Sequence, residues 1–158
     1  MPLTDHAAAL STSLARAHLV PGPAEPLIPA SFTPTTQLHV SFDGKAADLG
    51  TFFRAGECKQ APRLAFAPEA DADGASYTFV LADPDAPTPD DPKFAFWRHY
   101  VVGGLKPAVG GGEVQAGQVL TEFLGPGPND ELAEFVEKNG LQLVGMNWMT
   151  CAGDGWKE

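Results

Sequence analysis

The first residues of the chain show a helical pattern of apolar positions. The apolar residues recur at spacings of three and four, as on one face of a helix: Ala7, Leu10, Leu14 and Ala17. Thr4 can cap this helix, and Asp5 favours the positive end of its dipole. The pattern predicts a helix over residues 5–18 that ends at Pro21-Gly22-Pro23, because proline cannot continue a helix.

The middle of the chain changes to the alternating pattern of strands. Residues 24–36 carry three prolines and predict a connecting arm over the surface. From 37 to 42, apolar Leu38, Val40 and Phe42 alternate with polar residues, and Asp43-Gly44 predicts a turn. Further strands are predicted over 64–67, 77–82, 99–103, 119–124 and 141–150.

A second helix is predicted near the C-terminal end, over residues 130–139. Asn129 can cap it, and Gly140 can end it in a left-handed conformation. Because the helices do not alternate with strands, the pattern favours a mainly β fold, a sandwich or sheet with peripheral helices. We expect residues 1–23 to form an N-terminal helix and turn, and residues 24–158 to form a single domain.

Charge and composition narrow the possible partners. The 158 residues carry 10 basic and 20 acidic side chains, a net charge of −10, with no basic cluster. This argues against binding to nucleic acid or to anionic membranes. The apolar runs are too short for a membrane span, and no secretion signal is recognisable.

Cys58 and Cys151 are far apart and lack a CxxC partner, which predicts free thiols and a cytoplasmic protein.

Candidate binding residues follow the strand predicted at 77–82. Asp83-Pro84-Asp85-Ala86-Pro87 places two carboxylates and two rigid prolines at a strand end, which suits the rim of a pocket. Trp97 and His99 share one face if the next strand begins this early. A carboxylate of Asp83 close to His99 would favour the imidazolium form. The alternative for the acidic residues between 69 and 91 is a solvated acidic edge, and the alternative for His99 is a structural, hydrogen-bonded histidine.

The run Gly125-Pro126-Gly127-Pro128 is a further candidate. Glycines allow close backbone approach, and free amides before a helix can bind an anion. Asp130 and Glu131 already occupy that helix start, so a plain strand-to-helix turn is the alternative.

Enzyme chemistry has little support in the sequence. There is no GxSxG, Walker A, GxGxxG or HExxH motif, and the four histidines show no ligand spacing. A hydrolase built on Asp83 and His99 lacks a nucleophile. We therefore expect no enzyme activity, no cofactor and no metal.

Three segments together resemble the signature of the phosphatidylethanolamine-binding protein family: 82–87 (ADPDAP), 91–94 (DPKF) and 97–102 (WRHYVV). Residues 37–42, 49–50, 124–128 and 141–156 are also similar, so the resemblance spans about residues 27–156. The proline-rich arm and added N-terminal helix look most like fungal members, which include inhibitors of carboxypeptidase Y.

The resemblance implies a phosphatidylethanolamine-binding-protein-like β-sandwich with peripheral helices and a small pocket for phosphate-like anions. It implies non-enzymatic roles: binding of phospholipid head groups, inhibition of serine carboxypeptidases, or restraint of a protein kinase. The ligand-binding positions that it implies are Asp83, Ala86, Pro87, Phe94, Trp97, His99, Leu124, Gly125, Gly127 and Pro128.

The chain departs from the family after the glycine-proline turn. Family members continue there into a strand with a Gly-x-His-Arg-Tyr motif, whereas Pro128 is followed here by Asn129. One family strand and the second pocket histidine are therefore missing, as if an internal segment were lost by splicing or gene modelling. Three hypotheses remain: a binder of phosphorylated head groups, a carboxypeptidase inhibitor that uses residues 1–23, and a truncated member without ligand binding.

Overall fold

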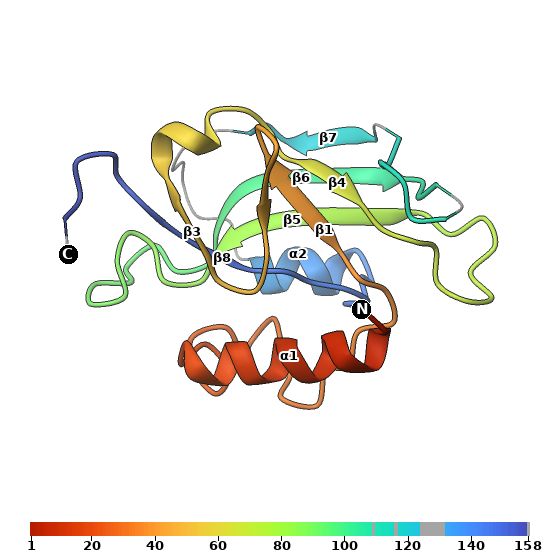
Figure 1. Ribbon diagram of the computed structural model, residues 1–158, viewed down its shortest axis with the longest axis horizontal. Helices are drawn as coiled ribbons and strands as arrows, with labels where there is room; N and C mark the ends of the chain where they lie inside the picture. Colours follow the sequence, from red (N-terminus) through yellow and green to blue (C-terminus); the bar gives the residue numbers. More distant parts are fainter. Residues whose placement is uncertain (109, 116, 124–131, 158) are drawn as a thin grey trace.

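The described part of the protein is a mainly β structure with helices at its periphery (Figure 1). The computed structural model describes residues 1–108, 110–115, 117–123 and 132–157. The helical elements are α1 (Leu3–Arg16), the 3-10 helix η1 (Ala55–Cys58) and α2 (Leu132–Lys138). The strands are β1 (His39–Phe42), β2 (Lys45–Ala47), β3 (Thr51–Arg54), β4 (Arg63–Ala65), β5 (Tyr77–Asp83), β6 (Trp97–Leu105), β7 (Gln118–Thr121) and β8 (Met149–Ala152).

The strands form three small open sheets. The first has the order β2-β1-β4 and the second the order β5-β6-β7, and both are antiparallel. The third is a parallel pair, in which Thr51 of β3 lies opposite Met149 of β8. This pair brings the C-terminal strand beside a strand from the first third of the chain.

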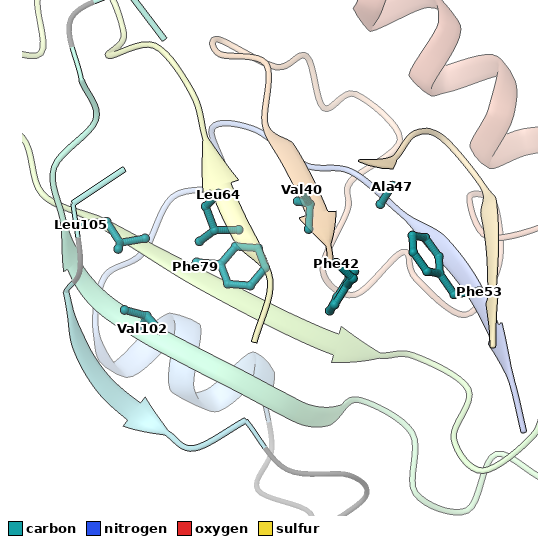
Figure 2. Packing of buried hydrophobic residues seen from close by; sticks show 8 residues of the cluster. All are labelled: Val40, Phe42, Ala47, Phe53, Leu64, Phe79, Val102 and Leu105. Carbon is teal, nitrogen blue, oxygen red and sulfur yellow. The ribbon is translucent and has the colours of Figure 1, made fainter. Parts of the chain in front are cut away.

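The main core lies between the two antiparallel sheets. Buried side chains from both sheets, and from β3, meet there (Figure 2). Phe42 of β1 packs edge-on against Phe53 of β3, with ring centroids 5.5 Å apart. Burial of apolar surface is the dominant favourable term in folding, and aromatic side chains contribute large areas to it. The predicted β-sandwich with peripheral helices is therefore confirmed. The buried members of this cluster, the main core, are Val40, Phe42, Ala47, Phe53, Leu64, Phe79, Val102 and Leu105.

The turn predicted at Asp43-Gly44 joins β1 and β2. Both residues have positive φ, 46° and 83°, as the tight turns that suit the twist of a hairpin require. Asparagine, aspartate and glycine tolerate this conformation best, so the two residues specify the hairpin.

Helix α1 lies below the sheets in Figure 1, as a separate layer. Leu10 and Leu14 pack with Met146 in a second apolar cluster, the helix cluster. The predicted N-cap was wrong: the helix begins at Leu3 after Pro2, and no side chain caps it. The carbonyl of Pro2 instead accepts hydrogen bonds from the amides of Asp5 and His6, so Thr4 lies inside the first turn.

The strand predicted over residues 141–150 was also largely wrong, because only its last two residues belong to β8. The preceding segment makes single hydrogen bonds rather than a ladder. The amide of Thr35 donates to the carbonyl of Val144, and the Asn147 side chain donates to the carbonyls of Leu38 and Ala47. The segment therefore connects α1, the arm and β1 without joining a sheet.

Most of the other predicted elements are present, but their first and last residues differ from the prediction. The arm over residues 24–36 has neither helix nor strand, although Ala24 and Thr36 are buried rather than on the surface. Strands β4 to β7 occur where predicted, whereas β2 and β3 were missed. Helix α2 occurs inside the predicted range, and residues 124–131 lie outside the described residues. Within the described ranges, no helix is long and apolar enough to span a bilayer.

Candidate functional site

A large cavity lies between the sheets, α2 and the C-terminal segment. Its volume is about 1020 Å³, and its walls are mostly apolar. Strand β5 lines it along its length, β1 contributes Val40 and Phe42, and α2 contributes Leu132 and Val136. Residues 141–151 also line it. Cavities of this size and character are typical ligand sites.

Two carboxylates give one end of the cavity a polar character. Asp83 ends β5, and its Oδ1 accepts a hydrogen bond from the amide of Asp85 at 3.1 Å. Burial raises the pKa of Asp85 to about 6, and a hydrogen bond to Asp83 and the Asp83 charge add to this shift. The neutral acid is favoured because two carboxylates so close resist joint ionisation. The charge of this end of the cavity therefore changes near pH 6.

The loop that follows is held in shape by its own backbone. The Ala86–Pro87 peptide bond is cis, and the carbonyl of buried Ala86 accepts a hydrogen bond from the amide of Phe94 at 2.9 Å. A further turn joins Thr88 and Asp91, whose backbone groups pair at 3.1 Å. Pro87 lines the cavity. The loop therefore has a fixed backbone conformation where it borders the cavity.

His99 occupies an irregular position in β6. Leu81 lies opposite Tyr100, while the next residue, Ala82, lies opposite Arg98, so His99 is an extra residue in the ladder. Such a bulge redirects side chains and interrupts the simple alternation of faces. His99 lines the cavity. The strand does begin at Trp97, as the sequence pattern required for the shared face.

Trp97 belongs to a neighbouring group that does not line the cavity. Its ring packs edge-on against Phe94, with centroids 5.6 Å apart, and it lies beside the loop that holds Ala86. The indole is buried, and its Nε1 finds no acceptor among the described residues. A buried donor without an acceptor is costly, so an unpaired indole N–H is a feature that a ligand or water would satisfy.

The structure therefore divides the predicted site residues into groups. Asp83, Pro87 and His99 line one cavity, whereas Ala86, Phe94 and Trp97 lie beside it. Leu124, Gly125, Gly127 and Pro128 lie outside the described residues. Contact between Asp83 and His99, and the binding role of each residue, stay predictions.

Several cavity residues were missed by sequence reasoning. Lys59, Cys58 and Cys151 line the same cavity as Asp83. Nothing in the local sequence links residues 58 and 151, because only the β3–β8 pairing brings them together. Within the described part of the chain, no three acidic, cysteine or histidine side chains form a group that could hold a metal ion.

Comparison with known proteins identifies a matching family and similar solved structures. A family model described as phosphatidylethanolamine-binding protein matches residues 30–136. The structure is similar to a carboxypeptidase Y inhibitor solved in complex with the cognate proteinase, with a TM-score of 0.76 and 19% identity over 94% of this chain and 97% of that chain. It is also similar to a phosphatidylethanolamine-binding protein from Plasmodium vivax, with a TM-score of 0.56 and 21% identity over 77% of this chain and 63% of that chain.

Proposed function

Because the chain belongs to the phosphatidylethanolamine-binding protein family, we propose that it is a non-enzymatic protein that inhibits a serine carboxypeptidase. The supporting observation is the extent of the match to the carboxypeptidase Y inhibitor. That match leaves 6% of 158 residues, about 9, outside it, fewer than the 14 residues of α1. The shared fold therefore includes at least part of the N-terminal helix.

The outer face of α1 offers a surface for such a partner. His6, Leu10 and Leu14 point inward and are buried, so the opposite face is free of packing. Its exposed members, the outer face, are Ala8, Ser11, Thr12 and Ala15. These small side chains allow close approach of another protein without a large cost in side-chain entropy.

Inhibition tests this proposal directly. The full chain is titrated against a serine carboxypeptidase of the carboxypeptidase Y type, and peptide hydrolysis is measured. We expect stoichiometric or saturable inhibition, and Ala15→Arg on the outer face should weaken it by at least tenfold, since a buried unpaired charge is costly at an interface. Ala70→Arg, at an exposed position of a loop far along the chain, is the matched control. Absence of inhibition by the folded chain contradicts the proposal.

A second proposal concerns the cavity: its polar end binds a phosphate-bearing small molecule or head group. Supporting it, His99 and Lys59 supply donors to a cavity that Asp83 and Pro87 also line, and Trp97 holds an unpaired N–H nearby. A chain with a net charge of −10 needs such local donors for an anion. The ionised Asp83–Asp85 pair opposes an anion, so binding should strengthen as pH falls through about 6, the pKa of Asp85.

Calorimetry with phosphoethanolamine tests the second proposal, with inorganic phosphate and ethanolamine as comparison ligands. His99→Ala should weaken phosphoethanolamine binding by at least tenfold, while His39→Ala, at an exposed position of β1, should not. Equal binding by both variants contradicts a role for His99. No binding at pH 5.5 or 7.5 favours the hypothesis of a truncated member without ligand binding.

A further inference from the structure

The two cysteines lie on segments that the fold brings side by side. Cys58 ends η1, which follows β3 directly. Cys151 belongs to β8 and lies opposite Phe53 of β3 in the parallel pair. The two residues are 93 positions apart in the sequence, so tertiary structure alone creates their proximity.

Hydrogen bonds hold the surroundings of this pair in place. The guanidinium of Arg54 donates to the carbonyls of Gly153 and Trp156 at 3.2 and 2.6 Å. The amide of Gly56 donates to Oδ1 of Asp154 at 2.7 Å. Arg54, which precedes η1, and Gly56 within η1 are thereby fastened to residues that follow β8. The backbone frame around Cys58 and Cys151 is fixed at several points rather than at one.

The thiols interact directly inside this frame. The Cys58 and Cys151 thiols lie close enough for each to affect the pKa of the other. Cys58 is partly buried beside the main core, whereas Cys151 is exposed to solvent. Both residues line the cavity, and the charge of Asp83 acts on Cys151. An accessible thiol thus stands next to a shielded one, the arrangement of an attacking and a resolving cysteine.

We propose that Cys58 and Cys151 form a reversible thiol–disulfide modification site, closed by a small disulfide such as glutathione disulfide, which fastens η1 to the C-terminal strand. The site is independent of the proposed function, because it depends on the β3–β8 frame and not on a ligand. Its closure joins two walls of the cavity covalently.

The reaction balances in two exchange steps. The Cys151 thiolate attacks one sulfur of glutathione disulfide, which forms a mixed disulfide and releases one glutathione thiolate. The Cys58 thiolate then attacks the Cys151 sulfur, which releases the second glutathione and forms the Cys58–Cys151 bond. The two protons from the protein thiols pass through solvent to the released glutathione thiolates. Two protein thiols are oxidised, and one glutathione disulfide is reduced.

The rate of closure has a defined pH dependence. Burial raises the pKa of the Cys58 thiol to about 11, and burial also raises that of Cys151. Only the thiolate attacks a disulfide, so little of either cysteine is reactive at pH 7. Decay of the mixed disulfide should therefore accelerate by about tenfold per pH unit from pH 7 to 9.

Mass spectrometry under non-reducing conditions tests the site. The reduced full chain is incubated with glutathione disulfide and quenched with acid. We expect a monomer that has lost the mass of two hydrogen atoms, a proteolytic peptide pair joined through Cys58 and Cys151, and a Tm higher by about 5–15 °C, reversed by dithiothreitol. A lasting glutathione adduct on Cys151, or a dimer linked through it, overturns the proposal.

Two variants separate the roles of the thiols. Cys58→Ser should stop at the mixed disulfide on Cys151, because no thiol is left to resolve it. Cys151→Ser should react at least tenfold more slowly than the unmodified chain, because Cys58 is shielded. Equal, complete glutathionylation of both variants contradicts the assignment. Should either variant fail to fold, the pH dependence of closure in the unmodified chain still decides, since a rate that is flat from pH 7 to 9 contradicts a partly buried resolving thiol with a raised pKa.

Discussion

The main core and the helix cluster differ in what supports their buried side chains. In the main core, Val40, Phe42 and Phe79 stand on strands that are paired in ladders. In the helix cluster, Leu10 and Leu14 of α1 pack against Met146, which belongs to a segment without regular structure. Packing on a sheet is lost only when the sheet opens, whereas a helix held by irregular segments can detach alone.

One polar contact strengthens the attachment of α1, but it is too weak to remove this difference. The indole Nε1 of Trp148 donates to Oγ of Ser13 at 3.0 Å, which ties the helix cluster to the C-terminal segment. A single hydrogen bond of this kind contributes only about 0.5–1.5 kcal/mol. We therefore expect α1 to open at a lower free energy than the sheets, and three substitutions can break or refine this expectation.

The largest effect is expected from Phe53→Ala in the main core. Phe53 is 0% exposed, and removal of its ring leaves a cavity beside Phe42. The free energy of unfolding should fall by about 3–5 kcal/mol. Urea unfolding followed by circular dichroism measures it. Phe52→Ala is the control, because Phe52 is 40% exposed and its truncation should lower the free energy of unfolding far less. Equal losses at the two neighbouring positions would contradict the assigned core.

A smaller and more local effect is expected from Leu10→Ala in the helix cluster. Leu10 is 2% exposed, so its truncation should cost about 2–4 kcal/mol. Hydrogen exchange should accelerate in the α1 amides while amides of β5 and β6 keep their protection. Leu3→Ala, at a 38% exposed position of the same helix, serves as the control. Uniform acceleration through both sheets would show that the two clusters open together.

The smallest effect is expected from Asp85→Asn, and it depends on pH. The pKa of Asp85 is raised from 3.8 to about 6, so the folded state binds more protons than the unfolded state between these values. The stabilisation by the protonated form is present below pH 3.8 and is lost as pH rises through 6. The amide should therefore stabilise the chain at pH 8 by about 1 kcal/mol, after allowance for solvent screening of a partly exposed group.

Thermal unfolding at pH 4 and pH 8 checks this prediction. The gain from Asp85→Asn should be confined to pH 8, and it should not change exchange in α1, because Asp85 lies in the loop that follows β5. Asp73→Asn, at an exposed position of the preceding loop, is the control. A gain of equal size at both pH values would contradict the raised pKa.

The sequence predicted those parts of the fold that depend on local pattern. Alternation marked β1, the Asp43-Gly44 pair marked its turn, and the spacing of Leu10 and Leu14 marked α1. It missed β3, because the apolar pair Phe52-Phe53 is too short to show alternation. It extended β8 backward, because the apolar residues of 141–148 pack on α1 and the cavity rather than in a sheet.

The candidate site was predicted only where its residues are neighbours in sequence. Asp83 ends one strand, Pro87 follows it, and His99 lies near the start of the next strand, so the local pattern pointed to all three. The bulge that redirects His99 depends on the pairing of β5 with β6, which single residues do not encode. The proximity of the segments that carry Cys58 and Cys151 depends on a parallel pairing across most of the chain, and no feature of the local sequence predicts it.

The β3–β8 pair also has a consequence for synthesis on the ribosome. Among the described strands β3 has only β8 as a partner, and the paired residues Thr51 and Met149 are 98 positions apart. A ribosome must therefore translate nearly a hundred further codons before β3 finds its partner. During that interval the aromatic strand is an unprotected edge, the kind that other nascent chains can pair with. Chaperone demand in the cell should thus be set by the synthesis of β8 rather than by that of the earlier strands.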